Sequence, residues 1–256
     1  MRDAAALLEN GGASNILRPV ALHGPVHARK ARRYMPTAGN LAAPVTVGIL
    51  VVTAAISVIG FSRRDVIEAL IFSPYRILRQ GQYHRMLTSA FLHGDLVHLG
   101  FNALTFYSFG ENIERVFGAT LLASIYFASI VGGSLLALVL HRNQRDYLAL
   151  GASGGVCGVV FASIFLLPGG SIMIFPIPFW IPTWAYALLF PLISFYGIQR
   201  KSDNIGHDAH LGGAIVGLLV ATCFHPDRVL ADPRLYAGVM GTSLAFFIYL
   251  VRQSSR

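Results

Sequence analysis

A serine in a run of small residues is the first candidate for chemistry: Gly151-Ala152-Ser153-Gly154-Gly155, between the charged residues 141–146 and the uncharged residues 156–167. A helix over 153–167 would be only ~22 Å long, whereas the hydrocarbon core of a bilayer is ~30 Å thick. We therefore expect Ser153 to begin a short helix at membrane depth, where the first N–H groups of the helix can bind an oxyanion. The same small residues also suit close helix packing, and the glycines alone do not decide between the two.

A second group of polar side chains lies just before and within an earlier apolar run. His98 and Asn102 are four residues apart, so a helix places them on one face about 6 Å from each other, and His93 precedes them. Ionisable and amide side chains are costly inside a membrane and usually have a function there. His98 and Asn102, with the Ser153 N–H, are candidate donors to a developing oxyanion.

A third group supplies a base. His210 lies in the stretch 206–213, and Gly213 and Gly217 form a G-x-x-x-G pair that matches Gly154 and Gly158. Two such pairs let helices approach closely, which would bring His210 to Ser153. An imidazole can take the proton of a serine hydroxyl and return it to a leaving amine. The three groups together predict a serine nucleophile, a histidine base and neutral oxyanion donors.

The elements that position these residues are membrane helices. The 256 residues are 54% hydrophobic and 12% charged, whereas soluble domains carry about 25% charged residues. The net charge of +8 comes from Lys and Arg spread between apolar runs, so we expect membrane anchoring and no nucleic-acid partner. Both cysteines, Cys157 and Cys223, lie in apolar runs and indicate buried thiols.

Apolar runs predict an all-α, polytopic membrane helix bundle with seven spans. Residues 1–43, with a basic cluster at 29–33, are expected to be a disordered cytoplasmic tail without a signal peptide. An interfacial helix is expected within 63–79, and a proline-rich segment, 168–182, cannot be helical throughout. The expected spans are 44–61, 95–111, 119–140, 153–167, 180–198, 208–224 and 235–251.

The three motifs, in this order, resemble the rhomboid family of intramembrane serine proteases: Gly151-Ala152-Ser153-Gly154, His98-x-x-x-Asn102 and Ala209-His210-x-x-Gly213-x-x-x-Gly217. The similarity extends over about 44–224. The resemblance implies a six-helix catalytic domain with a Ser153–His210 dyad without aspartate, and oxyanion donors that include His98 and Asn102. It also implies peptide-bond cleavage in transmembrane substrates, and no metal or cofactor is expected. Residues 225–256 would add a linker and a seventh transmembrane helix.

Other residues resemble family features in part. Tyr83-His84-Arg85 with Thr88 is similar to the first-loop signature, with His84 where tryptophan is frequent. Glu114-Arg115 resembles a glutamate–arginine pair at the cytoplasmic end of the second helix. For His84, Arg85, Glu111, Glu114 and Arg115 we expect structural roles at helix ends. Cys157 stands where many relatives have an aromatic residue that packs on the catalytic histidine.

Three other classes of protein share parts of this pattern. Gly151-x-Ser153-x-Gly155 also fits the nucleophile elbow of α/β-hydrolases, which seven apolar spans exclude. A metal-dependent seven-helix hydrolase or receptor would draw its ligands from His93, His98, His207, Asp208 and His210. A non-catalytic rhomboid-like binding protein would be expected to lack the serine or the histidine, and this sequence keeps both.

The expected location is the bacterial inner membrane, with the N-terminus cytoplasmic and the active site opening to the extracytoplasmic side.

Overall fold

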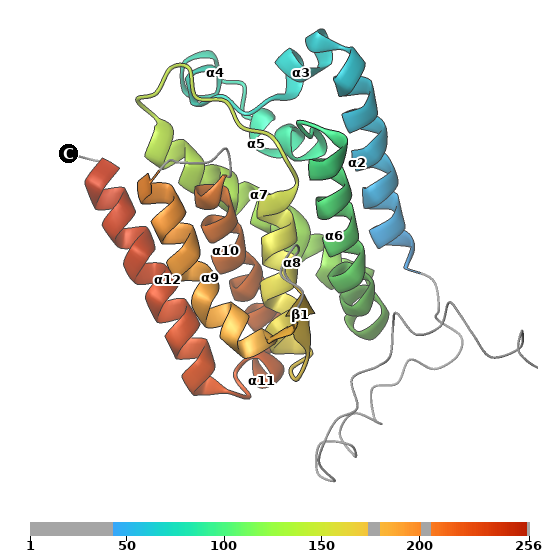
Figure 1. Cartoon of the computed structure of the whole chain (residues 1–256), viewed down its shortest axis with the longest axis vertical. Helices are drawn as coiled ribbons and strands as arrows, with labels where there is room; N and C mark the ends of the chain where they lie inside the picture. Colours follow the sequence, from blue (N-terminus) through green and yellow to red (C-terminus); the bar gives the residue numbers. More distant parts are fainter. Residues whose placement is uncertain (1–42, 174–179, 201–205, 255–256) are drawn as a thin grey trace, which may run out of the picture. The chain divides into compact units, whose positions relative to one another are not determined.

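The computed structural model describes residues 43–173, 180–200 and 206–254. The predicted tail, 1–43, lies outside these residues except for Ala43. The described part is an all-α membrane helix bundle, and each predicted span overlaps a helix (Figure 1). The fifth span, predicted for 180–198, is helical only from Thr183, because residues 180–182 form a short strand. These helices are α2 (Pro44–Ser62), α6 (Leu96–Phe117), α7 (Ala119–His141), α8 (Ser153–Leu166), α9 (Thr183–Arg200), α10 (His207–Phe224) and α12 (Pro233–Ser254).

Not all of these helices are equally suited to cross a membrane. Within the described residues, four are long and apolar enough: α2, α7, α10 and α12. Helix α8 is apolar but has only 14 residues, which fits the predicted short span. Helix α6 continues six residues beyond the expected end at 111, because Glu111 and Glu114 find partners, and it ends at Gly118, whose φ is +93°.

The segment between the first two spans is a series of short helices and not one interfacial helix. It forms α3 (Arg64–Leu70), α4 (Pro74–Gln80), α5 (Arg85–Thr88) and the 3-10 helix η2 (Ser89–Phe91). Pro74 cannot continue α3, and Ser73 begins α4 instead by accepting a hydrogen bond from the Arg76 N–H at 3.4 Å. Gly81, with a φ of +68°, ends α4.

The proline-rich segment after α8 is not helical in its described parts, as expected. Strands β1 (Ser171–Met173) and β2 (Trp180–Pro182) pair antiparallel, with Ile172 opposite Ile181. This short ribbon leads from the end of α8 into α9.

Helix α8 is the buried centre of the bundle. Nearly every residue from Gly154 to Leu166 is buried, and the helix packs against α6, α7 and α10 (Figure 1). Beyond α10, the short helix α11 (Pro226–Val229) leads to α12, which packs on α9, α10 and α7. The predicted seventh helix thus lies against the other helices along one side.

Candidate active site

The hydroxyl of Ser153 and the imidazole of His210 are in direct contact. Ser153 Oγ lies 2.6 Å from His210 Nε2, and the two residues are 57 positions apart in the chain. Both side chains are partly buried. A serine hydroxyl at this distance can pass its proton to a neutral imidazole nitrogen.

The loop before Ser153 is fixed by backbone hydrogen bonds to residues 63–95, the segment between α2 and α6, which we call the first-loop segment. Ala149 and Phe72 exchange two bonds of 3.0 and 3.2 Å, and the Gly151 N–H donates to the Ser89 carbonyl at 3.0 Å. Gly151 has a φ of +127°, a backbone conformation that residues with a side chain rarely adopt. This turn sets the point at which α8 begins, so that Ser153 is its first residue.

Glycine contacts hold α8 against the helix that carries His210. A Cβ added at Gly213 would overlap the carbonyl oxygen of Gly154, and one added at Gly217 would overlap Gly158. The two backbones therefore touch at both G-x-x-x-G pairs, as the sequence predicts. A similar contact joins α10 to α7, where a Cβ at Gly212 would lie 2.8 Å from the Gly132 carbonyl oxygen.

His98 lies beside Gly151, in the turn that precedes the serine, and Asn102 lies one turn further along α6. The position that a Cβ would take at Gly151 is 2.9 Å from the His98 ring and 3.9 Å from Ser153 Oγ. The Asp95 carboxylate accepts a hydrogen bond from the backbone N–H of His98 at 2.7 Å and so caps the start of α6. Asn102 is buried, and its amide nitrogen donates to the His98 carbonyl at 3.0 Å.

His93, which the sequence grouped with His98 and named as a ligand only in the metal-dependent alternative, contacts the turn before Ser153. The Ser57 hydroxyl donates to the Phe91 carbonyl at 2.9 Å, so it accepts a bond from His93 Nδ1, also at 2.9 Å. The free lone pair on Nε2 then faces the Ala152 N–H at 3.4 Å. Burial lowers the pKa of His93 to about 4, which keeps the ring neutral.

A buried carboxylate two residues before His210 joins three elements, a feature that sequence reasoning missed. Asp208 is 4% exposed and accepts hydrogen bonds from His141 at 2.8 Å and from the Tyr147 hydroxyl at 3.4 Å. The His141 and Tyr147 rings stack at 3.6 Å. The end of α7, the loop leading to Ser153 and the start of α10 are thereby tied together.

The first-loop arginine and the helix-end glutamate have structural contacts, as expected. Arg85 is 3% exposed and donates to the carbonyls of Glu68 and Ile71, each at 2.8 Å. Glu114 accepts from the Val45 and Thr46 N–H groups, at 2.9 and 2.7 Å, and so caps α2. Its neighbour does not pair with it: Arg115 forms its ion pair with Glu111 one turn earlier on α6.

Cys157 is partly buried against the core, and among the described residues the His207 ring lies 6.0 Å from the His210 ring, edge-on. In the described part of the chain, no three His, Cys, Asp or Glu side chains gather as they would around a metal ion. The alternative ligands His93 and Asp208 instead hydrogen-bond Ser57 and His141.

Residues 80–227, more than half of the chain, match the family model described as the Rhomboid domain. RHOMBOID-like protein 12, mitochondrial, of Arabidopsis thaliana is 31% identical over 199 residues, which cover 62% of this chain and 58% of that protein. Rhomboid protein 1, mitochondrial, of Saccharomyces cerevisiae is 32% identical over 137 residues, or 52% of this chain and 40% of that protein.

Bacterial proteins are similar as well. Rhomboid protease AarA of Providencia stuartii is 28% identical over 193 residues, which are 69% of either chain. The match covers less than two thirds of the two mitochondrial relatives, 58% of the Arabidopsis protein and 40% of the Saccharomyces protein. Relatives from mitochondria and from bacteria do not single out a bacterial inner membrane, which stays a prediction from the sequence.

Proposed function

Because the chain belongs to the rhomboid family, we propose that it is an intramembrane serine endopeptidase that hydrolyses peptide bonds in or near transmembrane helices of other membrane proteins. The family and the apolar helices make it an integral membrane protein. The observation that carries the proposal is the 2.6 Å contact between Ser153 Oγ and His210 Nε2 at the start of the short helix α8.

In the proposed reaction, Ser153 is the nucleophile and His210 the general base. Ser153 Oγ attacks the carbonyl carbon of the scissile bond while its proton moves to His210 Nε2. His210 then protonates the leaving amine, and the C–N bond breaks to give an acyl-enzyme. A water molecule attacks the ester with His210 again as base, which releases the carboxylate product and restores the serine hydroxyl.

The negative charge that forms on the substrate oxygen needs donors near Ser153. We assign this role to the Ser153 N–H, the His98 ring and the Asn102 amide. The first N–H groups of α8 have no acceptor within the helix, and the dipole of α8 favours a negative charge there. The closeness of His98 to Gly151 and Ser153 supports its part in this site. The Asn102 amide has two N–H groups, and only one of them is needed for its bond to the His98 carbonyl, so the other is the donor we assign to the oxyanion.

The domain arrangement of the proposal follows the helices. Residues 44–224 would form the catalytic domain, 225–256 the linker and seventh transmembrane helix, and 1–43 a cytoplasmic tail. The cluster of basic residues at 29–33 supports a cytoplasmic N-terminus, with the active site opening to the other side of the membrane. The partners are the lipid bilayer and transmembrane protein substrates.

The test combines cleavage with active-site labelling. The purified full chain in detergent should cleave a transmembrane reporter, and a fluorophosphonate probe should label Ser153, while Ser153→Ala shows neither. A metal chelator should leave cleavage unchanged. Loss of cleavage with the chelator would favour the metal-dependent alternative. A folded wild-type chain that neither cleaves nor reacts with the probe would favour a non-catalytic rhomboid-like binding protein.

A further inference from the structure

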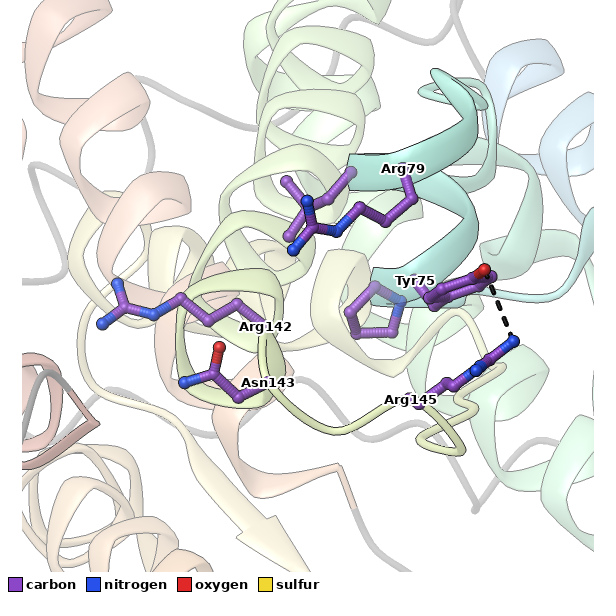
Figure 2. Close-up of a pocket in the computed structure, with 7 residues that line it drawn as sticks. Tyr75, Arg79, Arg142, Asn143 and Arg145 are labelled. Carbon is purple, nitrogen blue, oxygen red and sulfur yellow. Dashed lines mark hydrogen bonds between the residues drawn. The ribbon is translucent and has the colours of Figure 1, made fainter.

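An arginine-lined cavity lies away from the serine, between the first-loop segment and the end of α7. Its volume is about 520 Å³, and we call it the arginine pocket. Figure 2 shows that α4 contributes Tyr75 and Arg79, whereas the residues after α7 contribute Arg142, Asn143 and Arg145. Pro74 and Leu78 complete the lining.

The pocket has a strong positive charge. Three of its seven lining residues are arginines and none is acidic. Among the residues that the structure describes, no carboxylate forms an ion pair with Arg79 or Arg145. A guanidinium is always charged and matches the geometry of a phosphate group, so an anion is the ligand that suits these side chains.

Neutral partners hold two of the guanidinium groups in place. The Arg145 guanidinium lies 4.5 Å from the centre of the Tyr75 ring and donates to the Tyr75 hydroxyl at 3.4 Å (Figure 2). Arg142 donates to the backbone carbonyl of Ser254 at 3.1 Å. These contacts orient both arginines, and the contact with Tyr75 does so without cancelling the charge of Arg145, which lowers the entropy lost when an anion binds.

The surroundings favour a lipid as the source of the anion. The pocket lies where the apolar helix α7 ends at His141, so it is at the edge of the membrane. Leu78, which is 47% exposed, gives the pocket an apolar wall beside Arg79. A free phosphate ion would gain nothing from this wall, whereas the glycerol and upper acyl carbons of a phospholipid would pack against it.

We propose that the arginine pocket binds the phosphate of an anionic phospholipid, with Arg79 and Arg145 as its principal ligands. This site is separate from the proposed peptidase reaction and does not depend on it. Arg145 belongs to the connection between α7 and α8 that leads to Ser153, so a bound lipid would also fasten this connection to α4.

The test measures lipid binding to the full chain in a neutral detergent by native mass spectrometry. Phosphatidylglycerol and phosphatidylcholine with the same acyl chains are added in turn. The test variant is Arg79→Gln with Arg145→Gln. The control is Arg64→Gln with Arg234→Gln, two exposed arginines outside the pocket, so both variants lose the same charge. Thermal unfolding checks that each variant is folded.

We expect one phosphatidylglycerol to bind the wild type and the control with similar affinity. The test variant should bind it about 10- to 30-fold more weakly, because each arginine adds on the order of a few-fold to the affinity for an anionic lipid. Equal loss in the test and control variants would overturn the site. Displacement of the lipid by inorganic phosphate at equal concentration would overturn the lipid as its ligand. Neither readout involves cleavage, so a failure here leaves the proposed peptidase untouched.

Discussion

Replacing Gly213 with valine tests the geometry on which the catalytic proposal depends. Gly213 lies one turn after His210, and a Cβ there would be 2.7 Å from the carbonyl carbon of Gly154 and even closer to its oxygen. Relief of this overlap requires α8 and α10 to separate by about 1 Å. A displacement of that size costs roughly 10²-fold in rate when nucleophile and base must remain in hydrogen-bond reach. The overpacking should also lower the free energy of unfolding by about 1–3 kcal/mol.

The assay compares variants that differ in the room around the glycine. Gly213→Val should lose cleavage of the transmembrane reporter by about 100-fold or more, and Gly213→Ala should lose less. Gly241→Val is the matched control, because no atom lies within 4 Å of a Cβ at that position in α12. Thermal unfolding in detergent identifies the variants that are folded. Wild-type cleavage by folded Gly213→Val would refute the conclusion that this glycine contact sets the distance between Ser153 and His210.

Three further predictions concern polar residues near the site. Asn102→Ala should lower kcat by about 10²- to 10³-fold, the usual cost of one oxyanion donor, and an effect on KM alone would contradict that role. Burial lowers the pKa of His93 from 6.5 to about 4, so between these pH values the unfolded chain binds a proton that the folded chain does not. Stability measured by thermal unfolding should therefore fall as the pH drops from about 6.5 to about 4, with a slope of at most about 1.4 kcal/mol per pH unit. His93→Asn should lose this slope, and an unchanged slope would show that another group causes it. Asp208→Asn should weaken the bond to His141, lowering stability by about 1–3 kcal/mol and kcat by roughly 10-fold, and unchanged unfolding and kinetics would show that Asp208 does not position α10.

The sequence predicted the helices well where composition alone decides them. Apolar runs of about 20 residues have no alternative to a helix in a bilayer, because every backbone polar group must be paired within the segment. The predicted start of α8 at Ser153 agrees with the structure, since Gly151 allows the positive φ of the turn that precedes it. The end of α6 at Phe117 was missed, because the charged residues after 111 have partners that hydropathy does not reveal.

The sequence also predicted the close approach of α8 and α10. Glycine has no Cβ, so two G-x-x-x-G pairs remove the side chains that would otherwise separate the backbones. This pairing alone is enough to expect Ser153 near His210, and the contact of 2.6 Å agrees with it. The catalytic roles of the two residues stay a prediction.

Only the tertiary structure decided which polar groups support the site. Glu114 caps α2 by accepting from Val45, 69 residues earlier in the chain, His93 hydrogen-bonds Ser57 of α2, and Asp208 hydrogen-bonds His141 of α7. Partners so far apart in the chain leave no spacing signal, because their meeting depends on how each helix is rotated in the bundle. The sequence thus determined the membrane helices through backbone hydrogen bonding, and the glycine contacts between α8 and α10 through side-chain size. Both are local properties. The directions of the buried polar side chains were decided by packing, since a buried donor or acceptor must pair with whatever group the fold brings to it.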